Sequence, residues 1–417
     1  MEKLEVVLRL KIRLFSLLIF GLFSCSKEKT VPISLSPEVV SKNFHTGNSL
    51  GQFYFFNQVR NDSLLVFNVY DHALNIIDTR VDSVVSSIQF EFNGPNAVNE
   101  ISSFYYHNED SIFLAENNQA IVLITSRGEL KRRYSDFESS FETVEREKVY
   151  DNSPSLRFAS QLLYNSEEHE IFLYFTSFNQ PKKKRIFASY SLKTGKSKSI
   201  PIYYPEDYLG KKLDLSKLFL TSATLDGNGF AYIFSGSPRI FRYDFLSSSV
   251  SSVVANPPWE KVKADDIPFG PMNTSEKQLF MAENPFYYKI YYDHYRDVYY
   301  RLSSPPRPNF NEADFHYVNY NRILVSVLDS NLNLISDFYL PKENTYNVGF
   351  SFVTSEGLWI SYNSKNQDDE NFIKGDLIRI KELYLLFCFP AFPKAGRVFV
   401  PKCQLSGISK SRTGEYG

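Results

Sequence analysis

The sequence contains little cysteine, methionine and tryptophan: its 417 residues include 3 Cys, 3 Met and 2 Trp. Three cysteines are too few for a framework of disulfides, which excludes the small cysteine-rich secreted scaffolds. Neither charge is in excess, because 46 Lys and Arg oppose 47 Asp and Glu. Without a basic excess to neutralise phosphates, nucleic acid is not an expected partner.

The N-terminal region lacks a hydrophobic run of transmembrane length, since the uncharged stretch Leu14–Phe23 covers only ten residues. A membrane-spanning helix needs about 20 apolar residues. Basic residues precede this stretch, as they do in a secretory signal peptide. We therefore predict a signal peptide over residues 1–24. The basic residues are Lys3, Arg9, Lys11 and Arg13.

Cys25 follows the predicted signal directly, and the run Leu22–Cys25 (LFSC) resembles the lipobox of bacterial lipoproteins. There a diacylglycerol alkylates the thiol, a strong and selective nucleophile, and the signal is cut before the cysteine. Phe23 departs from the pattern, which usually has a smaller residue there. We predict lipidation of Cys25, a tether over residues 25–40 and anchoring in the membrane through the lipid. The alternative is a plain cleaved signal with a chance cysteine.

Aromatic residues are abundant: 37 Phe and 28 Tyr bring the aromatic share to 16%. Such residues favour half-buried strands, and short apolar-aromatic runs recur along the chain at intervals of 48 to 68 residues. Antiparallel units of this length are typical of propeller blades. We therefore predict an all-β, six-bladed β-propeller of four-stranded antiparallel blades over residues 41–383. The runs begin near Leu64, Ile112, Ile171, Phe230, Val298 and Leu358, and we take each as the first strand of its blade.

Two other architectures remain open, namely two separate domains or a long β-sandwich. Sandwich strands would recur every 8–12 residues without a longer period, so the period of about 60 residues favours blades. A ring also has to be closed, and we expect Gln52–Phe56 to join the last blade as a strand.

The C-terminal segment 384–417 differs from the rest of the chain. It carries five basic residues and one acidic residue, and it opens with a hydrophobic run that has no evident partner. We treat it as an atypical tail, either a true extension or the product of an altered reading frame. Cys388 and Cys403 lie in it, and the sequence does not decide whether they pair.

One segment is rich in residues that bind ligands. Tyr295, Arg296, Tyr300 and Arg301 can stack on sugars or pair with carboxylates, which makes them a candidate ligand face. The alternative is a blade strand in which the two arginines form structural pairs.

Signals for an enzyme are missing from the sequence. No Gly-x-Ser-x-Gly elbow, P-loop, His-Glu-x-x-His or dinucleotide fingerprint occurs, and the 6 His are scattered without ligand spacing. We therefore predict no catalytic residue, metal site or cofactor, although residues from different blades could meet at the propeller axis without forming a local motif.

Three phrases and the lipobox together resemble a family of bacterial lipoproteins that contain a domain of unknown function. The phrases are GPNAV at 94–98, ISSFYYHNEDSIFL at 101–114 and YYDHYRDVYYRL at 291–302. The resemblance covers roughly residues 25–383, and it implies a six-bladed, TolB-like propeller in the envelope of Gram-negative bacteria. It implies no catalytic residue.

These features predict a lipid-anchored protein of the cell envelope, in the outer membrane of a Gram-negative bacterium, that acts as a binding or scaffold protein for a protein or glycan partner. The alternative is a carbohydrate-active hydrolase or lyase with its site at the propeller axis.

Overall fold

A computed structural model describes the part of the chain between residues 37 and 380, with gaps. Within Met1–Lys381, one of two units of the chain, the described residues are 37–46, 57–117, 120–149, 154–155, 162–175, 183–208, 220–255, 283–307, 322–363, 366–367, 369 and 371–380. The predicted signal peptide, Cys25, the predicted closing strand Gln52–Phe56 and the tail with Cys388 and Cys403 lie outside them. No helix in the described ranges is long and apolar enough to cross a membrane.

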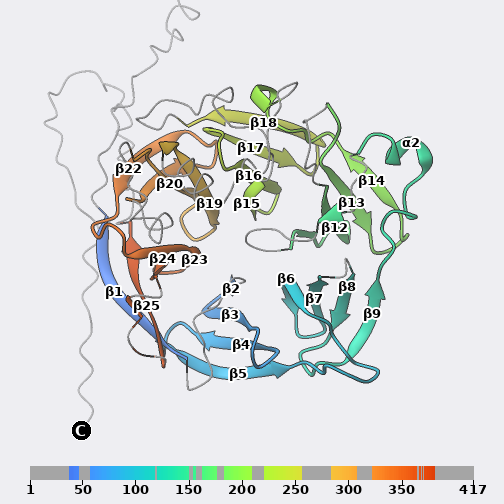
Figure 1. Ribbon diagram of the computed structural model, residues 1–417, viewed down its shortest axis with the longest axis horizontal. Coiled ribbons are helices and arrows are strands. Elements are labelled where there is room, and N and C mark those ends of the chain that lie inside the picture. Colours follow the sequence, from blue (N-terminus) through green and yellow to red (C-terminus); the bar gives the residue numbers. More distant parts are fainter. Residues whose placement is uncertain are drawn as a thin grey trace, which may run out of the picture. The chain divides into compact units, whose positions relative to one another are not determined.

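The fold is all-β, and its antiparallel sheets stand around a common centre as in a propeller (Figure 1). Three sheets have four strands each: β6 (Ile101–Asn108) to β9 (Leu130–Tyr134), β15 (Leu220–Leu225) to β18 (Ser249–Val254), and β19 (Phe286–Asp293) to β22 (Leu334–Tyr339). Their middle strands are β7 (Ser111–Glu116), β8 (Ile121–Ile124), β16 (Gly229–Phe234), β17 (Arg239–Asp244), β20 (Val298–Ser304) and β21 (Leu324–Asp329).

Two larger sheets complete the arrangement. A five-stranded sheet contains β10 (Pro154–Ser155), β11 (Tyr164–Asn165), β12 (Glu170–Phe175), β13 (Phe187–Ser191) and β14 (Ser197–Ile200). An eight-stranded sheet joins β2 (Asn57–Arg60), β3 (Ser63–Asn68), β4 (Ala73–Asp78) and β5 (Ser83–Gln89) to β1 (Glu38–His45), β25 (Phe372–Arg379), β24 (Gly357–Tyr362) and β23 (Tyr346–Thr354). Its two halves are connected by a single parallel pair, His45 with Ser83.

The apolar runs predicted from the sequence form strands, but each is the second strand of its sheet rather than the first. β3, β7, β12, β16, β20 and β24 are buried almost from end to end, which makes them apolar at consecutive positions. An additional strand precedes each run on the side of the central axis, for example β6 before β7 and β15 before β16 (Figure 1). The sequence prediction did not identify these inner strands.

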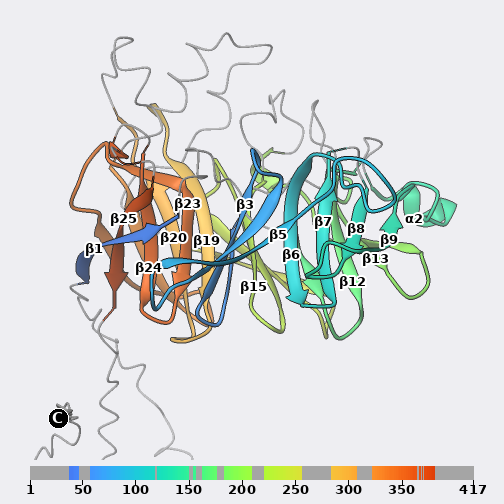
Figure 2. The same cartoon turned by 90° about the horizontal axis from the view of Figure 1, so that it is seen from below.

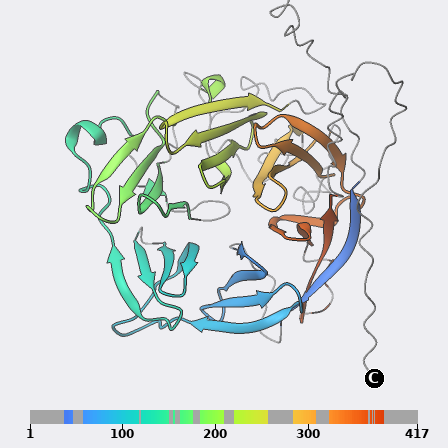
Figure 3. The same ribbon diagram turned by 180° about the vertical axis from the view of Figure 1, so that it is seen from behind.

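The strand that completes the last sheet comes from the beginning of the described chain. β1 pairs with β25 over its whole length, from Glu38 opposite Arg379 to His45 opposite Phe372. The two strands lie side by side in every view (Figures 2 and 3). β1 thus takes the place we expected for Gln52–Phe56, and residues 38–45 supply the strand next to β25.

A lysine of β1 reinforces this closure. The Lys42 ammonium donates to the Glu356 carboxylate in the β23–β24 turn and to the Thr79 carbonyl at 3.0 Å, and it forms an ion pair with the Asp82 carboxylate at 3.2 Å. Asp82 and Thr79 belong to the β4–β5 turn in the other half of the sheet. One cation therefore ties β1 to both halves of the eight-stranded sheet.

The core fills the spaces between neighbouring sheets, and aromatic rings supply much of it. Phe172 of β12 packs against Phe230 of β16 in the next sheet with ring centroids 5.1 Å apart. Within the eight-stranded sheet, Phe44 of β1 packs edge-on against Trp359 of β24 at 5.3 Å. Both faces of a blade are covered in this arrangement, which accounts for the high aromatic share.

Glycine is required where two strands approach most closely. A Cβ atom on Gly229, the first residue of β16, would lie 1.9 Å from the Tyr243 carbonyl oxygen. Gly357 opens β24 in the same position of its sheet, where a Cβ would lie 2.2 Å from the Ile378 carbonyl oxygen. These two glycines let the second strand of each sheet begin in close register with the third.

Candidate functional site

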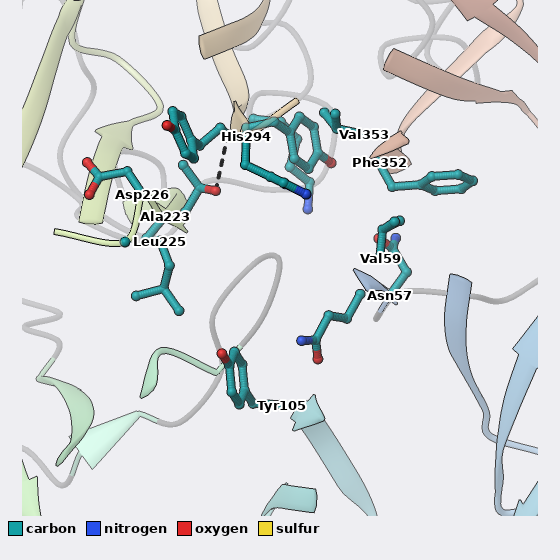
Figure 4. A pocket seen from close by; sticks show the side chains of 15 residues that line it. Asn57, Val59, Tyr105, Ala223, Leu225, Asp226, His294, Phe352 and Val353 are labelled. Atoms are coloured by element: carbon teal, nitrogen blue, oxygen red, sulfur yellow. Dashed lines mark hydrogen bonds between the residues drawn. The ribbon is translucent and has the colours of Figure 1, made fainter. Parts of the chain in front are cut away.

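A cavity of about 460 Å³ lies where the inner strands of several sheets face one another, and we call it the axial cavity. Figure 4 shows Asn57 of β2, Tyr105 of β6 and His294 of the turn after β19 around the same space. Its described lining consists of Asn57, Gln58 and Val59 of β2, Tyr105 of β6, Ala223–Gly227 at the end of β15, Lys289, Tyr291 and Tyr292 of β19, His294, and Phe352 and Val353 of β23.

Hydrogen bonds between inner strands fix the wall of the axial cavity. The Gln58 side chain donates to the Tyr106 carbonyl at 3.1 Å and accepts from the Tyr106 amide at 2.7 Å, which joins β2 to β6. The Tyr291 hydroxyl donates to the Ser351 carbonyl at 2.7 Å, which joins β19 to β23. These lining residues are therefore held in place before any ligand arrives.

A second set of bonds joins β15 to β19. The Ser222 hydroxyl accepts from the Ile290 amide at 3.1 Å, and the Thr224 hydroxyl accepts from the Tyr292 amide at 3.2 Å. Serine and threonine at alternate positions of β15 thus bond to alternate residues of β19. Their role explains why β15 (LTSATL) is too polar to be recognised as a buried strand from its sequence.

Asp226 is the carboxylate of the described lining, and its oxygens are already occupied. Its Oδ2 accepts from Arg242 Nε at 2.6 Å and from the Tyr299 hydroxyl at 2.6 Å. Its Oδ1 accepts from the Asn228 amide at 3.1 Å within the turn. Among the residues described, no group of three or more His, Cys, Asp and Glu is placed to hold a metal ion.

Lys289 contributes a buried cation to the lining. The residue is only 5% exposed, and burial lowers its pKa to about 8. It follows a bulge in β19, because Tyr287 pairs with Ser303 while Lys289 pairs with the next residue, Leu302. A bulge of this kind changes the direction of the side chains that follow it.

Two of the four residues of the predicted ligand face bond to Asp293 through their side chains. Arg296 Nη1 and the Tyr300 hydroxyl donate to Asp293 Oδ2 at 2.9 Å and 3.0 Å. Burial raises the pKa of Tyr300, and the Asp293 carboxylate adds to the shift. The Tyr295 hydroxyl donates instead to the Asn61 carbonyl at 2.9 Å, in the turn between β2 and β3.

Arg301, the fourth of these residues, points to a different neighbour. It is 1% exposed and donates to the carbonyls of Pro238 at 2.8 Å and Ala255 at 3.0 Å, which directly precede β17 and follow β18 of the adjacent sheet. Its guanidinium carbon lies 4.9 Å from the centroid of the Tyr287 ring. Burial lowers the pKa of Arg301 to about 10. The four residues therefore do not share one surface, and their role in ligand binding stays a prediction.

The residues of the axial cavity were not identified from the sequence. They come from β2, β6, β15, β19 and β23, which are widely separated along the chain. One feature of the sequence could have pointed to the cavity, namely a charged residue within a strongly aromatic strand, such as Lys289 in FYYKIYYD.

Comparison with known proteins identifies structural relatives. A member of the DUF4221 family from Bacteroides vulgatus superposes with a TM-score of 0.66 at 24% identity, over 84% of this chain and 100% of that one. A protein from Bacteroides fragilis, described as a predicted exported protein, gives a TM-score of 0.50 at 11% identity over 85% and 98%. A virginiamycin B lyase from Staphylococcus aureus gives 0.44 at 11% identity over 82% and 99%.

None of the curated proteins matches the sequence. The family model "Domain of unknown function (DUF4221)" matches residues 23–337, which is more than half of the chain. The resemblance noted in the sequence is thereby confirmed at the level of the family. The chain belongs to the DUF4221 family.

Proposed function

We propose that the protein is a lipid-anchored binding protein of the bacterial cell envelope and that the axial cavity is its ligand site. The observation that supports this most strongly is the cavity itself, about 460 Å³ in volume and lined by residues of five inner strands. Sites for small molecules are usually concave, preformed and of about 300–1,000 Å³. The bonds from Gln58, Thr224 and Tyr291 give the wall the rigidity that such a site needs.

The propeller that carries this site has six blades in our proposal. The eight-stranded sheet supports this count, because its halves share only the pair of His45 with Ser83. Each half, β2–β5 and β23–β25 with β1, then counts as a four-stranded blade. The remaining four sheets bring the ring to six.

Two observations support a location in the envelope. The uncharged stretch 14–23 followed by Cys25 has the pattern of a lipoprotein signal. The protein from Bacteroides fragilis that has a related fold is described as a predicted exported protein. Attachment to the outer membrane of a Gram-negative bacterium, through lipid on Cys25, is the arrangement we propose.

Fractionation of cells tests the anchor. A Cys25→Ala variant should move from the membrane fraction to the soluble fraction, whereas a Cys388→Ala variant, which also loses one thiol, should stay with the membrane. Retention of the Cys25→Ala variant in the membrane fraction would refute lipid anchoring.

A carbohydrate-active hydrolase or lyase is the alternative, and the described lining supports it less well. Glycoside hydrolysis usually requires two carboxyl groups about 5–9 Å apart on either side of the bond. Asp226 is the single carboxylate among the described lining residues, and Arg242 and Tyr299 already hold it. A cavity of this composition is better suited to binding than to acid–base hydrolysis.

A thermal-melt screen followed by a turnover assay tests the choice. A ligand present at 100 times its Kd adds about 2.7 kcal/mol to the stability of the folded state, which is readily detected. We expect a glycan or other small molecule to raise the melting temperature and to be recovered unchanged. Recovery of a cleaved product would overturn the binding function in favour of the enzyme.

A further inference from the structure

We propose that two copies of this chain associate edge to edge through β18, with the two strands antiparallel about a two-fold axis at Ser252. The partner that fits this edge is therefore a second copy of the protein. The contact goes beyond the proposed ligand-binding function, because it involves neither the axial cavity nor a ligand.

β18 forms an open edge of its sheet. It pairs with β17 on one side, and none of the other described strands pairs with it on the outer side. Its first four residues, Ser249–Ser252, are exposed, and Figure 1 shows the strand on the outer rim of the ring. Such an edge presents a row of backbone donors and acceptors that another strand can satisfy.

Most of the other outer strands carry charges, which protect an edge from pairing with other chains. β9 (LKRRY) has three basic residues, β14 (SKSI) has Lys198, β22 (LISDFY) has Asp337, and β1 (EVVSKNFH) has Glu38 and Lys42. β18 (SVSSVV) has neither a charge nor a proline. Its edge therefore lacks the usual protection.

β5 (SVVSSIQ) is also uncharged, but its edge is protected in another way. Ile76 pairs with Ser86 while Ile77 pairs with Val84, so Val85 forms a bulge in β5. A bulge twists an edge and makes it a poor template for a further strand. The six residues of β18 pair with β17 without any shift of register, which leaves β18 as the regular, uncharged edge among the described outer strands.

The sequence of β18 is complementary to itself. When Ser252 lies opposite Ser252 of the second copy, Val250 lies opposite Val254 of that copy on the same face of the joined sheet. Side chains directly opposite each other in an antiparallel pair are close enough to interact, so valine meets valine and hydroxyl meets hydroxyl. A register centred on Ser251 would place Val250 opposite Ser252 instead.

The charged residues of β17 favour the same register. Arg242 pairs with Ser251 within its own sheet, so a register centred on Ser251 would align Arg242 with Arg242 of the second copy across the joined sheet. In the register centred on Ser252, Ser251 lies opposite Val253 of the second copy, and Arg242 is aligned with Ile240 there. Like charges then do not face each other.

The direction of β18 makes the association compatible with a single membrane. Figures 1 and 3 show the strand running largely along the circumference of the ring, so the sheet there is perpendicular to the ring axis. The two-fold axis of an antiparallel pair is perpendicular to its sheet and is therefore parallel to the ring axis. Two copies consequently stand side by side with the same face in the same direction, and lipid on Cys25 of each, as proposed above, can enter the same membrane.

One strand pair is a small contact compared with the about 1,200–2,000 Å² buried in a stable interface. We therefore expect a weak dimer that forms where the chains are concentrated. Anchoring on a membrane provides this condition, because it confines the chains to a thin layer and raises their effective concentration.

Cross-linking in intact cells that express the full chain tests the contact. In a chain with Cys388→Ser and Cys403→Ser, the Ser252→Cys variant places two thiols opposite each other at the two-fold axis, within reach of a disulfide. We expect mild oxidation to give a reducible band at twice the mass of the chain. Ser86→Cys, an exposed serine of the other uncharged outer strand, is the matched control and should stay monomeric.

A charge on the edge should separate the copies. Val250 is 36% exposed, so Val250→Lys should leave the melting temperature unchanged while it lowers the cross-linked fraction of Ser252→Cys about tenfold. The control is Val85→Lys, because Val85 is an exposed valine of β5, and this variant should cross-link like its parent.

The results distinguish the contact from its register. Absence of a dimer band for Ser252→Cys, equal bands for Ser252→Cys and Ser86→Cys, or a band that Val250→Lys does not reduce would overturn β18 as the interface. Stronger cross-linking through Ser251→Cys than through Ser252→Cys would overturn the register.

Discussion

The Tyr299 hydroxyl donates a hydrogen bond to Asp226 Oδ2 over 2.6 Å, from β20 of one sheet to the β15–β16 turn of its neighbour. The same oxygen accepts from Arg242 Nε at 2.6 Å. Asp226 therefore bonds to Arg242 within its own sheet and to Tyr299 in the neighbouring sheet, and it serves as a joint between the two sheets. This structural use of Asp226 is the reason why the axial cavity has no free carboxylate among its described residues.

Replacement of Tyr299 by phenylalanine should weaken this joint. The variant keeps the ring but leaves Asp226, whose side chain is only 2% exposed, with one donor fewer. We expect the free energy of unfolding to fall by about 1.5–3 kcal/mol, the usual value for a bond to a buried charge. Denaturant unfolding measures the loss. Tyr292→Phe, which removes an exposed bond to Asp297 of 2.8 Å, is the matched control and should cost less. Equal losses in the two variants would contradict the role given to Asp226.

Arg301 should be essential for the packing of two adjacent sheets. Arg301→Met removes the donors to the carbonyls of Pro238 and Ala255 and leaves both acceptors buried. We expect a loss of about 2–4 kcal/mol in denaturant unfolding, since an unmet buried polar group is more costly than its bond is favourable.

The control for Arg301 is Arg239→Met, which loses one exposed contact of 3.4 Å to Ser252 and should cost less than about 0.5 kcal/mol. Unchanged or higher stability of Arg301→Met would show instead that the desolvation of the guanidinium outweighs its two bonds.

The closing strand β1 should depend on one side chain. Phe44 is 1% exposed and packs against Phe352 and Trp359, and it is the single fully buried residue of β1. Phe44→Ala should reduce the free energy of unfolding by about 3–5 kcal/mol, as is typical of a buried phenylalanine. His45→Ala, at the exposed neighbouring position, should have little effect. A small effect of Phe44→Ala would mean that the ring is held closed by other contacts.

Acid should loosen the contact between α2 (Thr143–Arg146) and β14. Bonds from Lys148 and then from Ser199 lower the pKa of Glu145 from 4.5 to about 2. A carboxylate with a lowered pKa stabilises the fold above its unfolded pKa of 4.5, and this contribution disappears as the pH falls towards 2. The Glu145→Gln variant should therefore be less stable than the wild type at pH 7, and the difference should close between pH 4.5 and pH 2.

Urea unfolding at several pH values measures this difference. The Ser199→Ala variant removes the hydroxyl that donates to Glu145 at 2.5 Å and accepts from Arg185 Nη1, but it keeps the amide bond and the Lys148 bond to Glu145. The part of its stability that depends on pH should therefore fall between those of the wild type and Glu145→Gln. If the difference in the free energy of unfolding between the wild type and Glu145→Gln does not change with pH, the contact does not depend on the charge of Glu145.

The fold class was predictable because the second strand of each sheet is buried on both faces. Such a strand is apolar at consecutive positions, as in β16 (GFAYIF) and β24 (GLWISY). This pattern can be read from the sequence without knowing which strands pair with it. The inner strand β2 (NQVR) is only four residues long, and β15 (LTSATL) uses its polar residues for bonds to β19. Neither strand has a hydrophobic pattern that distinguishes its sequence from that of a loop.

The closing strand was missed for a similar reason. β1 (EVVSKNFH) buries only Phe44 fully, because in its half of the eight-stranded sheet it is the strand farthest from the central axis. Gln52–Phe56 is far more aromatic and therefore seemed the better candidate. Hydrophobicity alone cannot show which strand lies at the edge of a sheet.

The candidate site was harder to predict than the fold because its residues are neighbours only in space. Lys289 and Tyr105 belong to different sheets, and no short motif contains both. Tyr300 and Arg301 were singled out for their chemistry, yet both are buried and bonded to other parts of the protein. In the sequence, arginine and tyrosine residues that join blades cannot be distinguished from arginine and tyrosine residues that bind ligands.

The pairing of β1 with β25 also determines the order in which the protein can be assembled. The Trp359 indole donates to the Lys42 carbonyl at 2.8 Å across a separation of 317 residues. The ribosome makes β1 first and β25 last among the strands of the described fold, so β1 lacks its antiparallel partner while the chain grows. Contacts this distant in sequence form slowly, and an unpaired strand edge is prone to aggregate in the meantime. The ring therefore closes only after synthesis has passed Arg379, and until then the strand that will seal it needs to be kept from other chains.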